Sequence, residues 1–340
     1  MTKFYKLLFL STLMISTLIS ISSYSWMGMW IGLEINIMSI TPILINQKNK
    51  ISSESAIKYF ITQTIASTAI MLSIISLMMQ FNFSSTLIKE LPTLIMNSGF
   101  MMKMGIAPFH FWFPEVLEGL SWTNSMIMLT WQKIAPMVLL MYNIELSMFY
   151  IIIIMISMII SGLMAINQIS LRKILAYSSI NHMGWMLSSM MLSQSIWLMY
   201  FLIYAITTIN MTMIFNLSGS FFLSQMNLIW NFNPMIKLFF LLNLFSMAGI
   251  PPFIGFLPKW LTIQAMVYSE LYLISVIMMM MTLIMIYVYL MMIMSSMTLS
   301  ITNSNWMNSN SFMKFNKTIT TMNFAMISGL IMVSLIFNFM

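Results

Sequence analysis

The sequence predicts an all-α polytopic membrane protein with about eleven transmembrane helices. A helix needs about 20 apolar residues to cross a membrane. Hydrophobic residues make up 60% of the 340 residues and charged residues only 6%, and the mean hydropathy is +0.92. A soluble domain carries about a quarter charged residues. Long apolar runs follow one another along the chain, and the loops between them divide their Lys and Arg unequally. Such a chain cannot cover itself with polar surface, so lipid is its solvent.

Each predicted span is an apolar run long enough to cross the hydrocarbon core. The ninth run is too long for one simple helix and contains several Gly and Pro residues, which predicts two half-helices joined by an unwound stretch. An Asn/Ser/Thr-rich loop is expected at 295–321, and the whole chain, 1–340, is expected to form one membrane domain. The runs are 5–22, 26–46, 55–80, 92–113, 122–142, 147–167, 173–192, 195–222, 236–268, 271–294 and 322–340.

The basic residues of the loops predict the orientation of the chain, because Lys and Arg gather on the inner side of a membrane protein. With these spans, one side holds Lys3, Lys6, Lys48, Lys50, Arg172, Lys173, Lys237, Lys314 and Lys317. The opposite side holds Lys89 beside Glu90, Glu145 and Glu270. The N-terminus is therefore expected in the positive compartment, which is the matrix if the protein is mitochondrial, and the C-terminus on the other side.

Composition also excludes several classes of function. The chain has no Cys and two His, which excludes iron–sulfur ligation by cysteine and is too few for a cytochrome with two b-type haems. Its basic residues are spread along the sequence, so a nucleic-acid-binding stripe is not expected. Heavy use of Met, Ile, Asn, Phe and Ser fits an A+T-rich mitochondrial genome.

A short motif occurs twice. Residues 105–114 read Gly-Ile-Ala-Pro-Phe-His-Phe-Trp-Phe-Pro, and residues 249–258 read Gly-Ile-Pro-Pro-Phe-Ile-Gly-Phe-Leu-Pro. The first copy ends the fourth span and the second lies in the ninth, so the copies are expected to run in opposite directions. Inverted repeats with paired broken helices are typical of ion-coupled transport folds. The alternative is two unrelated Pro/Gly helix breaks.

Once the residues assigned to the loops are set aside, five charged residues remain inside predicted spans: Glu34, Lys58, Lys103, Lys133 and Lys259. Lys58 lies near the start of its span and can extend to the interface. Each of the others costs about 2.5–3.5 kcal/mol at the bilayer centre, so they must be paired, hydrated or neutral for part of the time. A buried lysine that gains and loses a carboxylate neighbour is a switchable proton site. The alternative is a static ion pair that holds helices together, although one carboxylate cannot neutralise three lysines.

Helix breaks and one histidine add to this pattern. Pro108 and Pro136 follow Lys103 and Lys133 by a few residues, and each frees the backbone carbonyl four residues before it. His182 shares one helix face with Ser178, Asn181 and Trp185, and imidazole titrates near neutral pH. His182 is therefore a candidate relay, and the alternative is a hydrogen-bonded packing histidine.

Several of these runs together resemble one family. They are Trp-Met-Gly-Met-Trp-Ile-Gly-Leu-Glu-Ile-Asn (26–36), Lys-Met-Gly-Ile-Ala-Pro-Phe-His-Phe-Trp-Phe-Pro-Glu-Val (103–116), Thr-Trp-Gln-Lys-Ile-Ala-Pro (130–136), Ser-Ser-Ile-Asn-His-Met-Gly-Trp-Met (178–186) and Gly-Ile-Pro-Pro-Phe-Ile-Gly-Phe-Leu-Pro-Lys-Trp (249–260). These blocks look like NADH dehydrogenase subunit 2, the mitochondrially encoded antiporter-like subunit of respiratory complex I, and are most similar to arthropod members. The resemblance extends over nearly the whole chain. After about residue 295, the chain resembles the family only in its hydropathy.

The resemblance implies an antiporter-like fold of two inverted five-helix repeats, 1–142 and 147–294, followed by the terminal helix 322–340. It implies a multi-pass subunit of NADH:ubiquinone reductase in the mitochondrial inner membrane that has no redox centre of its own. FMN, iron–sulfur clusters and ubiquinone are then expected in other subunits. The implied partners are other membrane-arm and accessory subunits and lipid, with cardiolipin as a candidate.

The resemblance also implies a role for each candidate residue. Glu34 would be the coupling glutamate, Lys103 its lysine partner, Lys133 the connecting lysine and Lys259 the terminal lysine, with His182 as an intermediate relay. Quinone reduction in another subunit would shift the pairing of Glu34 with Lys103 and drive a proton onward. Two alternatives stay open: a free-standing cation/proton antiporter subunit and a purely structural membrane-arm subunit.

Overall fold

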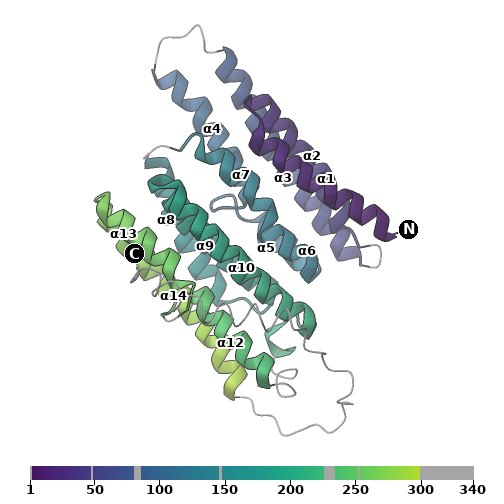
Figure 1. The fold of residues 1–340 in the computed structure, drawn as a ribbon, viewed down its shortest axis with the longest axis vertical. Helices are drawn as coiled ribbons and strands as arrows, with labels where there is room; N and C mark the ends of the chain where they lie inside the picture. The colour runs from purple at the N-terminus through teal and green to yellow at the C-terminus, as the bar shows by residue number, and fades with distance from the viewer. Residues whose placement is uncertain are drawn as a thin grey trace, which may run out of the picture. The chain divides into compact units, whose positions relative to one another are not determined.

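The computed structural model describes residues 2–46, 49–79, 86–144, 148–225, 234–251 and 253–298. The elements in these ranges are helices (Figure 1), apart from an isolated bridge between Ser170 and Phe222. The chain divides into two compact units, Met1–Leu146 and Ser147–Met340. The predicted terminal helix 322–340, and the predicted loop from residue 299 onward, lie outside the described residues.

Unit 1 contains the helices α1 to α7. Helix α2 packs against α1 and α3, and α4 packs against α3 and α7. Gly32 permits the close approach of α1 and α2, because a Cβ built on it would lie 2.7 Å from the backbone nitrogen of Ser20. The helices are α1 (Thr2–Ser22), α2 (Trp26–Leu44), α3 (Lys50–Met79), α4 (Thr86–Met104), α5 (Trp112–Gly119), α6 (Trp122–Leu129) and α7 (Trp131–Met141).

Unit 2 is arranged around α9. This helix packs against α8, α10, α13 and α14, and nearly every residue from Leu171 to Met190 is buried. Its buried residues include Ser, Asn and His side chains as well as apolar ones, so α9 carries polar groups into the core. The helices are α8 (Met148–Ile166), α9 (Leu171–Leu192), α10 (Gln194–Ser218), α12 (Pro234–Ala248), α13 (Phe256–Tyr268) and α14 (Tyr272–Thr298).

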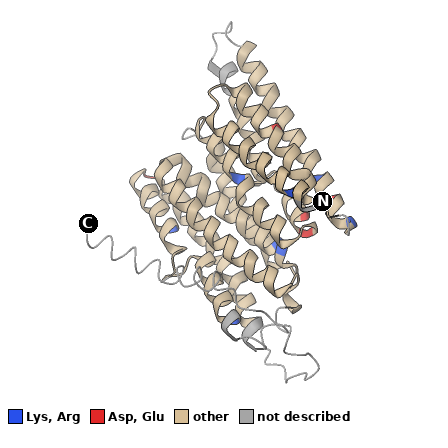
Figure 2. Ribbon diagram, turned by 45° about the vertical axis from the view of Figure 1, so that its right-hand side comes forward, with Lys and Arg blue, Asp and Glu red and all other residues tan. Residues whose placement is uncertain are grey.

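Helix length and composition confirm a membrane protein. Among the described residues, six segments are long and apolar enough to cross a membrane, and they lie in α1, α2, α3, α8, α10 and α14. Figure 2 shows how few Lys, Arg, Asp and Glu residues these helices carry. Each other predicted span up to 271–294 overlaps α4, α9 or a pair of shorter helices. The chain is an all-helical membrane protein.

Two predicted spans are not single helices. The span 92–113 contains the end of α4, a turn and the start of α5, so Pro108 lies outside any helix, and the prediction that it frees a helical carbonyl is wrong. The span 122–142 is divided at Thr130 into α6 and α7. There the Thr130 hydroxyl donates to the carbonyl of Met126 over 2.7 Å, a bond that Thr208 also makes within the unbroken helix α10. Pro136, inside α7, removes a further backbone donor.

The predicted break in the span 236–268 is confirmed, since α12 ends at Ala248 and α13 begins at Phe256. Both copies of the repeated motif end a helix in the same way. Gly105 and Gly249 have φ values of 71° and 76°, and each N–H bonds to the carbonyl three residues earlier. The N–H groups of Ile106 and Ile250 bond to the carbonyl five residues earlier. This paired bonding is a Schellman motif, which glycine permits because it adopts positive φ without a Cβ clash. The inverted repeat itself stays a prediction, because many helices end in this way.

Candidate functional site

All three predicted lysines are buried. The exposed fractions of Lys103, Lys133 and Lys259 are 7%, 2% and 9%, while Glu34 on α2 is half-buried. Lys103 was predicted near the middle of a span, yet it is the penultimate residue of α4 and so lies at a helix end. Lys133 lies in the first turn of α7, directly after the break at Thr130. Helix ends therefore position both lysines of unit 1.

Lys103 and Lys133 line the same cavity in unit 1. The cavity offers about 20 Å³ to the centres of water molecules, which is room for roughly one. Residues from α2, α3, α4, α5, α6 and α7 form its wall, and several of them are polar. The lining residues are Leu33, Asn36, Ile37, Tyr59, Gln63, Lys103, Met104, Trp112, Phe113, Met128, Gln132, Lys133 and Pro136.

Neutral hydrogen-bonded side chains line this cavity. The Gln132 amide donates to Oδ1 of Asn36 over 2.8 Å, and the Tyr59 hydroxyl donates to Oε1 of Gln132 over 3.3 Å. The Gln63 amide donates to the backbone carbonyl of Lys103 over 3.3 Å. These groups join α2, α3, α4 and α7 around the two lysines. Sequence analysis missed them, because a neutral Gln, Asn or Tyr in an apolar run carries no signal of its own.

Glu34 and Lys103 do not form a closed ion pair. Glu34 interacts electrostatically with Lys103, but the two side chains are farther apart than the 4.0 Å limit of a salt bridge. Within the described part of the chain, Lys103 Nζ has no hydrogen-bond partner. Lys133 Nζ lies over the Phe113 ring, 5.1 Å from its centroid, a favourable cation–π geometry. The Glu34 carboxylate is therefore near enough to interact electrostatically with the Lys103 ammonium group without holding it in a salt bridge.

In unit 2, Lys259 bridges the break between α12 and α13. It lies in the first turn of α13, and its Nζ donates to the carbonyl of Ala248, the last residue of α12, over 2.7 Å. The C-terminal end of a helix carries partial negative charge, which stabilises a cation. A Cβ on Gly249 would lie 2.9 Å from Lys259 Nζ, so the glycine leaves room for the ammonium group.

His182 lies within the buried face of α9. Its Nδ1 is 3.0 Å from the hydroxyl of Tyr200 on α10. Asn181, the residue before it, donates to the Ser161 hydroxyl on α8 over 3.3 Å. The polar residues predicted on one face of this helix are thus buried in contacts with neighbouring helices.

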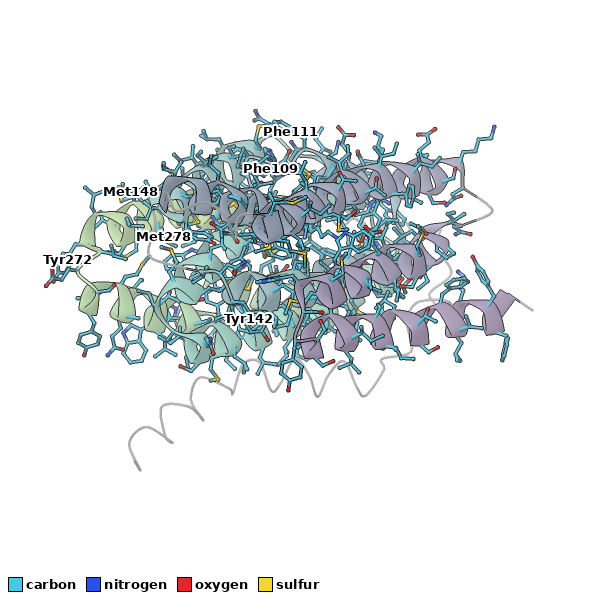
Figure 3. All side chains as sticks on the ribbon, turned by 90° about the horizontal axis from the view of Figure 1, so that it is seen from above. Phe109, Phe111, Tyr142, Met148, Tyr272 and Met278 are labelled. Atoms are coloured by element: carbon cyan, nitrogen blue, oxygen red, sulfur yellow. The ribbon has the colours of Figure 1, made fainter. Side chains whose placement is uncertain are left out.

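One ion pair escaped sequence analysis, which interpreted Lys58 as a residue extending to the interface. Lys58 Nζ lies 2.7 Å from Oε2 of Glu115, and about half of each side chain is exposed. The pair borders an apolar groove of unit 1 that also includes Phe109 and Phe111. Figure 3 shows Phe111 at the edge of the unit. The described residues contain no group of His, Cys, Asp and Glu that could hold a metal ion.

Comparison with known proteins identifies the family. Residues 23–285 match the family model described as NADH:quinone oxidoreductase/Mrp antiporter, transmembrane. The chain is 44% identical to NADH-ubiquinone oxidoreductase chain 2 of Anopheles gambiae over 100% of both chains. It is 46% identical to the same chain of Aedes aegypti over 99% of both.

Solved structures share the fold. Respiratory complex I from Thermus thermophilus contains a chain with a TM-score of 0.80 at 19% identity, covering 97% of this chain and 77% of that one. The Mrp complex from Dietzia sp. gives a TM-score of 0.72 at 14% identity, covering 84% and 59%. At these identities the likeness shows an antiporter-like fold, while the sequence relatives show the family. The chain therefore belongs to the NADH-ubiquinone oxidoreductase chain 2 family.

Proposed function

We propose that this chain, a membrane-arm subunit of complex I, moves protons through Lys103 and Lys133 in unit 1 and through Lys259 in unit 2. Glu34 acts as the coupling carboxylate and His182 as an intermediate relay. The observation that carries the proposal is the cavity of unit 1, where two buried lysines meet a neutral hydrogen-bond chain.

The chemistry of this cavity supports proton transfer. Removing an ammonium group from water disfavours its charged form, and a carboxylate nearby favours it. Because Glu34 influences Lys103 without forming a salt bridge, a small movement of either side chain changes the proton affinity of the lysine. Amide and hydroxyl groups between the lysines orient water without adding a charge of their own.

The coupling step follows from this arrangement. Quinone reduction in another subunit shifts the pairing of Glu34 with Lys103, and a proton then passes by way of Lys133 toward Lys259. The carbonyl of Ala248 and the end of α12 stabilise the charged form of Lys259. Passage from unit 1 to unit 2 stays a prediction.

Neutralising the first pair tests the proposal. Glu34→Gln and Lys103→Met are introduced separately into the assembled enzyme, and protons moved per NADH oxidised are measured in closed membrane vesicles. The proposal expects a lower ratio for both variants. An unchanged ratio in correctly assembled enzyme would overturn it.

The two alternative functions differ in their support. A free-standing cation/proton antiporter is disfavoured, because the full-length relatives are oxidoreductase chains. A purely structural role for the charges predicts that neutralising Lys259 impairs assembly and leaves pumping per assembled complex unchanged. The same vesicle measurement distinguishes this outcome.

We also propose the finer arrangement that the family implies. The chain crosses the mitochondrial inner membrane eleven times, in two inverted five-helix repeats followed by one terminal helix, with the N-terminus in the matrix and the C-terminus toward the intermembrane space. The unequal division of Lys and Arg between its loops supports this orientation. Other membrane-arm and accessory subunits and cardiolipin are the proposed partners, and FMN, iron–sulfur clusters and ubiquinone belong to other subunits.

A further inference from the structure

Three buried tyrosines surround the turn of α9 that carries His182. Tyr200 and Tyr204 come from α10 and Tyr289 from α14, and their exposed fractions are 1%, 2% and 3%. The rings of Tyr200 and Tyr204 lie 6.0 Å and 5.3 Å from the imidazole ring. This aromatic cluster lies wholly within unit 2, and none of the proposed steps above uses it.

The hydroxyl groups of the cluster have different partners. Tyr204 bonds to Ser179 and Tyr289 to Ser178, both about one turn before His182 on α9. Tyr200 instead places its hydroxyl 3.0 Å from Nδ1 of His182. Tyr200 therefore contacts the imidazole directly, at a defined ring nitrogen.

The hydrogen bond at Nδ1 holds the imidazole ring in one orientation. Neutral imidazole carries a hydrogen on one nitrogen, and the other nitrogen accepts. When the Tyr200 hydroxyl donates to Nδ1, the ring hydrogen lies on Nε2. When the ring is doubly protonated, Nδ1–H donates to the same oxygen, which accepts as readily as it donates. The contact thus persists in both charge states and holds the ring in one orientation.

We propose that Tyr200 is the positioning residue of the His182 relay: its hydroxyl can donate to Nδ1 or accept from it, and so holds the orientation of the ring in both charge states. The inference rests on the proposed relay role of His182. A neutral hydroxyl holds the ring here without adding a charge to the core. Tyr289, equally buried but bonded to a serine, supplies a matched control.

The test is a double-mutant cycle in the assembled complex. Tyr200→Phe, His182→Gln, the double variant and Tyr289→Phe are compared in closed vesicles for the rate of NADH-driven proton transport. NADH oxidation by an artificial acceptor measures the amount of assembled enzyme. Tyr200→Phe is expected to slow transport roughly tenfold, less than the roughly 100- to 10,000-fold that a proton-transferring group itself contributes, because Tyr200 only positions that group. The double variant is expected to match His182→Gln alone, and Tyr289→Phe to match the wild type.

Each result is decisive. If His182→Gln transports normally, the relay role of His182 is wrong and the inference falls with it. If His182→Gln is slow and Tyr200→Phe is normal, the inference is wrong while the relay stands. If the two effects multiply in the double variant, Tyr200 acts independently of His182, which also overturns the inference.

Discussion

Lys259 on α13 donates a 2.7 Å hydrogen bond to the carbonyl of Ala248, the last residue of α12. The ammonium group thereby satisfies a carbonyl that the helix break leaves without an intrahelical partner. It also lies against the negative end of the helix. One residue of the broken helix thus stabilises the break and places a charge beside it.

Gly249→Ala is expected to disturb this contact. The new Cβ would lie 2.9 Å from Lys259 Nζ, and a positive φ costs a non-glycine residue about 1–2 kcal/mol. Gly219→Ala is the matched control, because Gly219 also has positive φ, 63°, with nothing within 4 Å of its built Cβ. Both variants should lose the stability that a positive φ costs, Gly249→Ala should lose more because it also disturbs the Lys259 contact, and Gly249→Ala alone should lose proton transport. Equal transport by the two variants would contradict the importance of the Lys259 contact.

Gln132→Leu is expected to weaken unit 1 and slow proton transport. It removes the donor to Asn36 and the acceptor of Tyr59, and each buried polar group left unpaired costs about 1–3 kcal/mol. Tyr59→Phe removes only the hydrogen bond from Tyr59 to Gln132 and keeps the one from Gln132 to Asn36, so its effect should be smaller. Thermal unfolding of the assembled complex and the vesicle assay measure both effects. A Gln132→Leu variant with wild-type transport would show that these neutral hydrogen bonds play no part in it.

The sequence predicted those features of the fold that depend on local chemistry. Apolar runs gave the helices, and the Gly and Pro residues around Gly249 gave the break between α12 and α13. The break at Thr130 was missed, because no glycine or proline stands at that position. The repeated motif was found, yet its shared Schellman bonding required coordinates.

In the candidate site, too, some features could be predicted from local sequence and others depended on tertiary packing. Burial of Lys103, Lys133 and Lys259 could be predicted, because a charge within an apolar run stands out. The neutral residues around these lysines and around His182 could not be predicted. Gln132, Asn36 and Tyr59 come from three helices, and Tyr200 lies 18 residues from His182. Neutral residues that meet only through tertiary packing leave no periodic pattern in one sequence.

Gly32→Ala is expected to separate α1 from α2 and to destabilise the complex by about 1–3 kcal/mol, the usual cost of overpacking. The new methyl group would lie 2.7 Å from backbone atoms of Ser20, which cannot rotate away. Gly162→Ala, whose Cβ would lie 3.5 Å from Ile284, should be tolerated. Thermal unfolding of both variants checks the contrast, and an equally stable Gly32→Ala variant would contradict the close approach.

Lys58→Gln is expected to leave proton transport unchanged. The ion pair with Glu115 is half-exposed and borders the apolar groove rather than the cavity of Lys103 and Lys133. Transport per assembled complex is measured for Lys58→Gln and Glu115→Gln. A loss equal to that of Lys103→Met would place this pair on the proton path.

The central claim is that the buried lysines release and rebind protons, and Lys133→Arg in closed vesicles tests it most directly. Arginine retains the positive charge but cannot be deprotonated in a protein, so it preserves a structural charge and abolishes a relay. Protons moved per NADH oxidised are compared for the wild type, Lys133→Arg and Lys133→Met at equal amounts of assembled enzyme. We predict that Lys133→Arg lowers the ratio as far as Lys133→Met. A wild-type ratio with arginine would contradict the relay and leave Lys133 as a fixed charge.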